Sequence, residues 1–301
     1  MQVDYSQASA RSVSLSERVH ALLELMRPAN LFTAAADSVA GSAVAGSAPL
    51  PGLVLASMAL YGGGVVFNDV FDRRLDAVER PERPLPSGRV TLGTSVLFGA
   101  LLWAGGIAAG WFVSPVSGVL ALLVALSALI YDVWAKHSAV FGPVFMGSCR
   151  ALNLLLGLSA VPEAIPQRWF AALIPFAFVA GITLISTGEV HGGAAGRLLS
   201  GAIAMSAAIA GIAGVALWNG REAIWTAPFF VLLVWRVGPP LWRALRARTP
   251  QPIRKAVVAG VLSLIVLDAC LSAGYGRAIG GLAVLALLPI SAWVARRFAV
   301  S

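Results

Sequence analysis

The chain has 301 residues, of which 58% are hydrophobic and 12% are charged, and its mean hydropathy is +0.82. Soluble domains carry about 25% charged and about 45–50% apolar residues, so this chain has more apolar surface than a water-soluble core could bury. The composition excludes soluble, collagen-like, disordered and disulfide-stapled proteins. Its net charge of +8 is that of a membrane protein with basic cytoplasmic loops, and we expect no nucleic-acid partner.

The predicted elements begin with a polar segment, residues 1–20, which lacks the apolar stretch of a cleavable signal peptide. Ten apolar stretches follow, and each is a predicted helix because lipid cannot satisfy free backbone groups. They are 28–48, 50–67, 92–113, 115–135, 139–161, 168–187, 198–218, 223–241, 255–273 and 278–295. The last two could instead be one span and a re-entrant piece. We therefore predict an all-α bundle of about nine to ten transmembrane helices, forming a single domain over residues 21–301.

Basic residues follow every second span, which sets the predicted orientation. They are concentrated after the second span, at Lys136 after the fourth, and between 243 and 255 after the eighth. Because cytoplasmic loops carry an excess of Lys and Arg, we expect a multi-pass protein of the cell membrane with its N-terminus and these loops in the cytoplasm.

Four oxygen-bearing side chains follow the second span. Asn68, Asp72 and Asp76 are spaced four residues apart, and Asp69 lies between them. If the span continues as a helix, all four lie on one face at the membrane edge. Oxygen ligands suit Mg²⁺, which proteins hold through one or two carboxylates together with substrate phosphates.

The same segment is rich in arginine and proline. Arginine matches the geometry of phosphate groups, and the prolines end the helix and fix a turn over the acids. The residues concerned are Arg73, Arg74, Arg80, Arg83, Arg89, Pro81, Pro84, Pro86 and Gly88. The alternative is a solvated interfacial loop in which acids and bases pair with each other.

These residues resemble a known family. Asn68-Asp69-x-x-Asp72-x-x-x-Asp76, followed by Arg80-Pro81-x-Arg83-Pro84-Leu85-Pro86-Ser87-Gly88, is similar to the first aspartate-rich motif of the UbiA-type intramembrane aromatic prenyltransferases. Arg27-Pro28 with Asn30, and Tyr131-Asp132 with Lys136, are also similar to that family. In span order and loop positions the resemblance covers roughly residues 20–295.

The resemblance implies a helical bundle around a central cavity that opens to the cytoplasm and to lipid. It implies an integral membrane prenyltransferase in which two acidic motifs bind Mg²⁺ and the diphosphate of an isoprenyl donor. The allylic carbocation formed there attacks a lipophilic, usually aromatic, acceptor. The implied cofactor is Mg²⁺, and the implied partners are an isoprenyl diphosphate, the lipophilic acceptor and membrane lipid.

Residue roles follow from matching the motifs position by position. Metal ligands would be Asn68, Asp69, Asp72, Asp76 and Glu189. Catalytic residues would be Asp72, Asp76, Glu189 and His191. Diphosphate-binding residues would be Arg73, Arg80, Lys136 and Arg150, although Arg150 could equally form a structural pair with Asp132 or Glu189. We expect Asp37 and Asp268 to be hydrogen-bonded to neighbouring helices.

The second acidic motif departs from the family pattern. After the sixth span the chain reads GEVHGG, in which Glu189 is the only carboxylate. Either the site binds a second Mg²⁺ weakly or not at all, or the chain has lost prenyl transfer and binds or transports a lipophilic secondary metabolite. Together with YDVWAKH (131–137) and CRALNLLLG (149–157), this loop resembles the EboC subgroup, whose members are encoded in clusters linked to secondary-metabolite handling.

Overall fold

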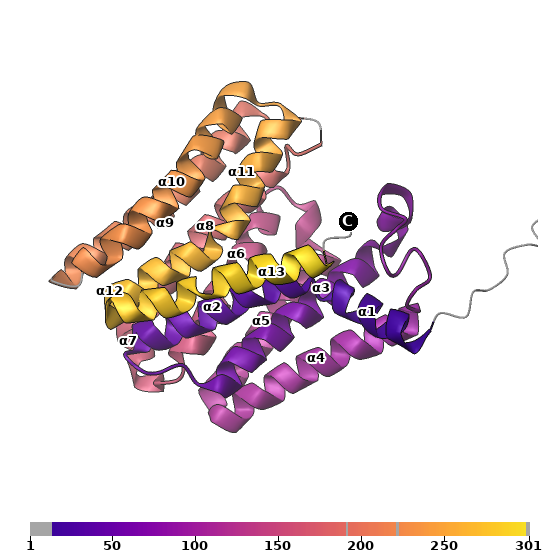
Figure 1. Cartoon of the computed structure of the whole chain (residues 1–301), viewed down its shortest axis with the longest axis horizontal. Coiled ribbons are helices and arrows are strands. Elements are labelled where there is room, and N and C mark those ends of the chain that lie inside the picture. Colours follow the sequence, from indigo (N-terminus) through magenta and orange to yellow (C-terminus); the bar gives the residue numbers. More distant parts are fainter. Residues whose placement is uncertain (1–13, 191, 221–222, 299–301) are drawn as a thin grey trace, which may run out of the picture.

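A computed structural model of the chain describes residues 14–190, 192–220 and 223–298, and these residues form an all-helical bundle (Figure 1). The longer helices are α1 (Leu15–Leu25), α2 (Pro28–Ala45), α3 (Pro51–Glu79), α4 (Leu92–Val113), α5 (Pro115–Val133), α6 (Phe141–Leu158), α8 (Leu173–Ser186), α9 (Ala195–Trp218), α10 (Ala223–Ala247), α11 (Pro250–Leu262), α12 (Leu264–Leu285) and α13 (Leu287–Phe298). The short helix α7 (Ile165–Arg168) and short 3₁₀ turns, including Ala135–His137, connect some of them.

Within the described ranges, 9 helical segments are long and apolar enough to cross a membrane. This number confirms the predicted polytopic all-α class. The segments are Pro51–Glu79, Leu92–Val113, Pro115–Val133, Phe141–Leu158, Pro162–Ser186, Ala195–Trp218, Ile224–Ala247, Pro250–Gly276 and Ala278–Phe298.

The first predicted span, α2, is helical but is not one of these nine. Its polar side chains Thr33, Asp37, Ser38 and Ser42 are buried. Helices α3, α6, α12 and α13 pack around α2, so it lies at the centre of the bundle rather than against lipid. Sequence hydropathy predicts a helix here, but it does not show that neighbouring helices shield the polar side chains of that helix from lipid.

Several predicted spans are interrupted or longer in the structure. The stretch predicted at 168–187 begins at the last residue of α7 and consists of the 3₁₀ turn Trp169–Ala172 and α8. A break at Ser263 divides α11 from α12, and α12 then continues to Leu285, through the gap predicted between 273 and 278. The next break lies just before Pro289, which has no N–H to bond the preceding turn.

The predicted polar segment 1–20 is helical in its last part. Ser14 caps α1, because its side chain accepts from the Glu17 backbone N–H while the Glu17 carboxylate accepts from the Ser14 N–H. Residues 1–13 lie outside the described part of the chain. Helix α1 therefore leads directly into α2 at Arg27, a residue with the left-handed φ of 48°.

Close approach of α2 and α6 depends on two glycines. A Cβ atom on Gly157 would lie 2.1 Å from the Ser38 carbonyl oxygen, and one on Gly41 would lie 2.1 Å from that of Leu154. Only glycine allows backbones to approach this closely. The contact brings polar side chains of the two helices, described below, within hydrogen-bonding distance.

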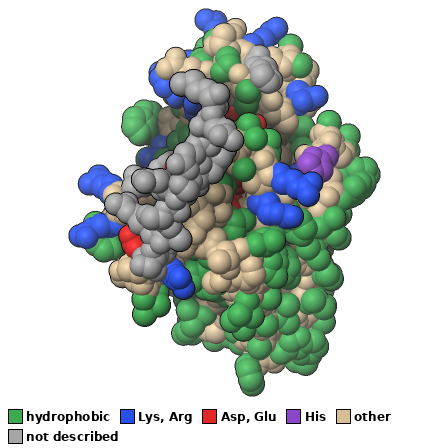
Figure 2. All heavy atoms as spheres, turned by 90° about the vertical axis from the view of Figure 1, so that its right-hand side faces the viewer, with side chains coloured by type: hydrophobic (Ala, Val, Ile, Leu, Met, Phe, Trp, Pro, Cys, Tyr) green, Lys and Arg blue, Asp and Glu red, His purple; other side chains and the backbone are tan. Residues whose placement is uncertain are grey.

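One end of the bundle collects the polar connections. The turn after α3, the 3₁₀ turn after α5, the loop after α8 and the end of α10 all lie there, at the right and top of Figure 1. Figure 2 shows this end, where basic side chains surround recessed acidic ones and hydrophobic side chains cover the flank. We call this region the polar end.

Candidate active site

The acidic residues lie on a helix that extends beyond its apolar part. Helix α3 continues to Glu79 because its first proline after the apolar part is Pro81. At about 100° per residue, Asn68, Asp72, Asp76 and Asp69 occupy an arc of about 100°. The helix on which the predicted stripe depended is therefore present, and the stripe runs along one side of α3 at the polar end.

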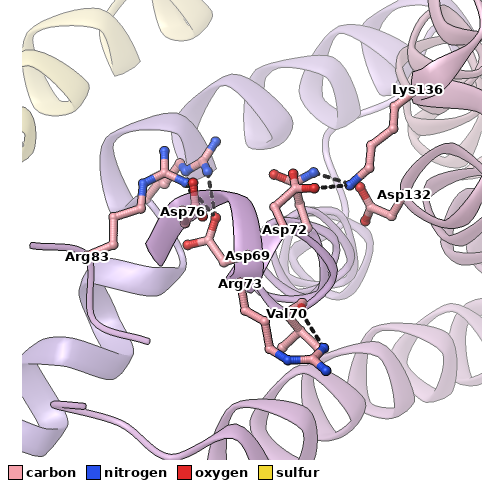
Figure 3. Close-up of polar contacts among 10 residues, drawn as sticks. Asp69, Val70, Asp72, Arg73, Asp76, Arg83, Asp132 and Lys136 are labelled. Carbon is pink, nitrogen blue, oxygen red and sulfur yellow. Dashed lines mark hydrogen bonds and ion pairs between the residues drawn. The ribbon is translucent and has the colours of Figure 1, made fainter. Parts of the chain in front are cut away.

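Arg83 holds one side of the stripe. Its Nη1 lies 2.8 Å from Oδ2 of Asp76 and 3.3 Å from Oδ1 of Asp69 (Figure 3). Asp69 also accepts a hydrogen bond of 2.8 Å from Nη2 of Arg27. Both carboxylates are buried, so the proline-rich turn folds back over the acids and supplies the cation that neutralises them.

A clasp between Arg89 and Glu24 holds that turn against α1. The two nitrogens Nη1 and Nη2 of Arg89 lie 2.6 Å and 3.0 Å from the Glu24 carboxylate oxygens. Gly88 has a φ of +74°, which residues with a side chain rarely adopt, and it reverses the chain just before the clasp. The turn is thus anchored by the sequence immediately preceding α2.

The other side of the stripe faces α5 and the 3₁₀ turn that follows it. Nζ of Lys136 lies 2.5 Å from Oδ1 of Asp72, and Nδ2 of Asn68 donates to Oδ1 of Asp132 at 2.8 Å. Asp132 is buried, and Figure 3 shows it beside Lys136. The stripe is therefore divided into an Asp69–Asp76 pair and an Asn68–Asp72 pair, each with partners from a different element.

A cavity of about 280 Å³ opens beside Asn68 and Asp132, between α3, α5 and α6. Arg27, Tyr131, Asn68 and Asp132 line its polar part, whereas its other lining residues are mostly apolar or small. The latter include Leu60, Gly64, Val65, Val124, Ala128 and Met146. The site thus joins a charged mouth to an interior that is apolar except for Arg150 and Asn153 of α6, which suits a ligand with an anionic head and a hydrocarbon chain.

Arg150 lines the cavity from α6, but its partner is neither Asp132 nor Glu189. Its Nη1 lies 2.7 Å from Oδ2 of Asp37, and its Nη2 lies 2.7 Å from the Thr33 hydroxyl. The guanidinium also lies over the ring of Tyr61, 5.2 Å from the centroid. The expected hydrogen bond from Asp37 to a neighbouring helix is present, but a linear pattern could not name Arg150 as its partner, because nothing in it pairs the first span with the fifth.

Glu189 lies in the loop after α8, where its surroundings are both apolar and basic. Burial raises its pKa above the usual value for glutamate, while the charges of Arg254 and Arg80 lower it. Since Arg80 ends α3, this loop lies near the end of the acidic stripe. His191, the other residue predicted here, lies outside the described residues.

Glycines shape the loop through close packing. The Gly193 N–H donates to the Arg248 carbonyl at 3.1 Å, and Gly192 has a φ of +85°. A Cβ on Gly188 would lie 2.8 Å from the Gly193 Cα atom. Gly192 and Gly193 thus pack against the junction of α10 and α11.

Two predicted diphosphate ligands lie outside the ion-paired cluster. Arg73 is exposed, and Figure 3 shows its side chain directed away from the acids, with Nη1 donating to the Val70 carbonyl at 3.3 Å. Arg80 is exposed, and its charge lowers the pKa of Glu189. In the structure, Arg27, Arg83 and Lys136 are the cations in contact with the stripe. Only the fold distinguishes Arg83 from the other arginines of its segment.

Within the described residues, no group of three or more His, Cys, Asp or Glu side chains converges on one point. Mg²⁺ does not require such a cage, since one or two carboxylates and substrate phosphates complete its shell. Asp72 beside Asn68, and Asp69 beside Asp76, are donors of that kind, and each pair is balanced by a basic side chain. The donor chemistry fits Mg²⁺ bound together with a diphosphate.

The fold and the site define a polytopic membrane protein with an acid-lined cavity, and comparison with known proteins gives its family. Residues 29–265 match the UbiA prenyltransferase family, and the chain belongs to that family. Over 150 residues it is 37% identical to a digeranylgeranylglyceryl phosphate synthase of Methanothrix thermoacetophila, a match that covers 48% of this chain and 56% of that protein. The matched region thus spans just over half of that relative's length.

Two solved structures share the fold. The apo structure of a UbiA homolog from Aeropyrum pernix superposes with a TM-score of 0.63 at 18% identity, covering 80% of this chain and 96% of the other. A UbiA homolog from Archaeoglobus fulgidus, bound to GPP and Mg²⁺, superposes with a TM-score of 0.51 at 13% identity, covering 88% and 99%. At these identities the likeness establishes the architecture.

Proposed function

We propose that this protein is an Mg²⁺-dependent intramembrane prenyltransferase that moves an isoprenyl group from an isoprenyl diphosphate to a lipophilic acceptor. One observation carries the proposal: Asn68 of the α3 stripe, bonded to Asp132 of α5, lines the mouth of a cavity whose other lining residues are mostly apolar. A diphosphate head at the mouth and a hydrocarbon chain inside would match this gradient of polarity. The GPP and Mg²⁺ bound by the Archaeoglobus homolog support the same class of ligand.

In this proposal Asn68, Asp69, Asp72 and Asp76, together with Glu189, hold the metal. Bound Mg²⁺ would neutralise the diphosphate and make it a better leaving group. Lys136 and Arg83 now balance carboxylates at 2.5 Å and 2.8 Å, and would be free to contact phosphate oxygens once those carboxylates have another cation. Arg73 and Arg80 would serve at longer range, from the rim of the site.

The inner part of the cavity would hold the prenyl chain and exclude water. Arg150 and Tyr61 form one wall of the cavity, and the guanidinium occupies one face of the ring. Dry surroundings protect an allylic cation from hydrolysis, and preorganised charges act more strongly there than in water. His191, two residues after Glu189 in the sequence, would act on the diphosphate or as a base.

The acceptor and the subgroup belong to the same proposal. Similarity to a digeranylgeranylglyceryl phosphate synthase favours a prenylated glyceryl phosphate as the first acceptor to test. The likeness of the GEVHGG, YDVWAKH and CRALNLLLG segments to EboC proteins favours a secondary metabolite instead. Basic residues at the polar end favour a cytoplasmic site in both cases.

The test is a direct assay in nanodiscs. The protein is incubated with Mg²⁺, radiolabelled isoprenyl diphosphates of several lengths, and either a prenylated glyceryl phosphate or a lipid extract of the host. Released diphosphate and labelled lipid are measured for the wild type, for Asp72→Asn, and for the matched control Glu79→Gln on the exposed end of the same helix.

We expect release that requires Mg²⁺, persists in Glu79→Gln and is lost in Asp72→Asn. Activity that survives in a well-folded Asp72→Asn protein would refute the metal assignment. Binding of the diphosphate without release, across all acceptors, would favour the non-catalytic alternative of a membrane protein that binds or transports a lipophilic metabolite. The shortened second motif, with Glu189 as its only carboxylate, is the feature that keeps this alternative in the test.

A further inference from the structure

A second polar cluster lies inside the bundle, away from the acidic stripe. Asp37 of α2 and Asp268 of α12 are both fully buried, with 0% exposure. Asp37 accepts hydrogen bonds at Oδ2 from Arg150 at 2.7 Å and from Nδ2 of Asn153 at 2.9 Å. Helix α12 packs against α2, and Asp268 lies within hydrogen-bonding reach of Asp37. The positive charge of Arg150 also acts on Asp268.

The hydrogen bonds of this cluster do not account for Asp268. Neither of its carboxyl oxygens has a donor partner among the described side chains and backbone groups, and Oδ1 of Asp37 also lacks one. Two ionised carboxylates cannot hydrogen-bond each other, because each only accepts. An ionised carboxylate buried without a donor is costly, and such a group takes up a proton instead.

The balance of charges around Asp268 also indicates that one carboxyl group of the cluster is protonated. Among the side chains that the structure describes, the charged groups that act on Asp268 are Asp37 and Arg150. On α10, which packs against α12, Arg236 points to the Ser263 hydroxyl, with Nε 3.4 Å from Oγ. One guanidinium therefore faces two carboxyl groups, and one positive charge is missing.

We propose that Asp37 and Asp268 hold one proton between them, so that the cluster is neutral and Arg150 is fixed at the inner end of the cavity. The proton resides mainly on Asp268, which donates to the free Oδ1 of Asp37. Oδ2 of Asp37 then remains a charged acceptor for Arg150 and Asn153, the two cluster residues that also line the cavity. Asp37 and Asp268 are thus positioning residues that act through Arg150.

The proton itself can be tested without any enzymatic activity. The infrared carbonyl band of a protonated carboxyl group is well separated from carboxylate bands, and difference spectra against single variants assign it. We expect such a band in the wild type and its loss in Asp268→Asn, the neutral isostere of the protonated acid. Loss is also expected in Asp37→Asn, because Asp268 must then ionise to balance Arg150.

Arg150→Met is the variant in which we expect the infrared band to change in the opposite direction. With the guanidinium removed, both carboxyl groups must be protonated to remain buried, so the band should grow rather than vanish. The absence of a band in the wild type would overturn the proposal, as would a band that is insensitive to Asp37→Asn. A melting temperature that rises with Na⁺ over choline at equal ionic strength would also overturn it, since a metal cation would then supply the missing charge.

The melting temperature of a variant also tests whether Asp268 is the protonated acid. Asp268→Asn should keep the wild-type melting temperature, because the amide replaces a neutral donor. An Asp268→Asn protein that fails to fold would show that the negative charge is required there, and would overturn the proposal.

The positioning effect on Arg150 rests on the proposed prenyl transfer and has its own readout. In Asp37→Asn the KM for the isoprenyl diphosphate should rise about tenfold, for the loss of a charged hydrogen-bond partner of Arg150. The value of kcat should change less. An unchanged KM would contradict the positioning role, whereas inactivity of the wild type would count against the proposed function and leave the infrared test intact.

Discussion

Every carboxylate of the α3 stripe is paired with at least one basic side chain from outside α3. Arg83 serves Asp69 and Asp76, while Lys136 serves Asp72. From the sequence, acid–base pairing and ligand binding are alternative roles for these residues. The structure shows the pairing, and the same residues remain the proposed ligands, because a paired carboxylate can exchange a basic side chain for a metal.

Arg83→Gln should destabilise the protein when Mg²⁺ is absent. Removing one partner of a fully buried pair costs about 3–5 kcal/mol, and the effect should be smaller here because 17% of the Arg83 side chain is exposed. Thermal unfolding in detergent measures the loss, and Mg²⁺ should restore part of it. Arg74→Gln, at an exposed position of the same segment, is the control, and equal effects of the two changes would contradict the prediction.

Glu189 should make stability depend on pH. Burial raises its pKa in the folded state, so the folded protein binds this proton more tightly than the unfolded chain does. The ionised carboxylate therefore lowers stability at pH values above the folded pKa, and stability returns as the pH falls through it. Glu189→Gln should raise the melting temperature of metal-free protein at neutral pH, and the gain should shrink in acid.

Melting curves measured across pH for Glu189→Gln and for Glu163→Gln, at the other end of the bundle, check this. A gain that is independent of pH, or equal in the two variants, would rule out Glu189 as the source. Mg²⁺ should also reduce the gain if Glu189 is a ligand.

At the scale of elements, the crossing of α2 and α6 decides how Arg150 is used. Gly157→Ala would place a Cβ atom 2.1 Å from the Ser38 carbonyl oxygen and push the two helices apart. Overpacking of this kind costs about 1–3 kcal/mol, and it would also stretch the Arg150–Asp37 hydrogen bond. We expect a lower melting temperature and weaker binding of the isoprenyl diphosphate.

Gly105→Ala is the matched control on α4, because no atom lies within 4 Å of its added Cβ. Alanine is favoured over glycine in a helix by about 0.5–1 kcal/mol, so this change should be neutral or slightly stabilising. If Gly157→Ala behaved like Gly105→Ala, the close crossing would not constrain the bundle.

At the scale of the whole molecule, the directions in which the helices run place the connections after α3, α5, α8 and α10 at the polar end. The connection from α6 to α8, which contains Glu163, lies at the other end. With the polar end in the cytoplasm, Glu163→Cys should react with a membrane-impermeant thiol reagent on intact cells. Glu79→Cys should react only after permeabilisation, and the wild type supplies the background. The reverse pattern would invert the orientation.

The sequence by itself determined the class of the molecule and the acidic face of α3 on which the proposed site rests. High hydropathy forces nearly every element to be a helix, because lipid leaves backbone groups no other partner. The four-residue spacing of Asn68, Asp72 and Asp76 required only that α3 continue past its apolar part, and local helical geometry then fixed their common face.

Only the tertiary structure decided which charges meet. Arg83 rather than Arg73 contacts the acids, because the proline-rich turn folds back over α3. Arg150 pairs with Asp37 across 113 residues of sequence, and α2 is buried in spite of its polar side chains. Such pairings arise from the packing of helices distant in sequence, and hydropathy and local spacing do not specify which buried faces come together.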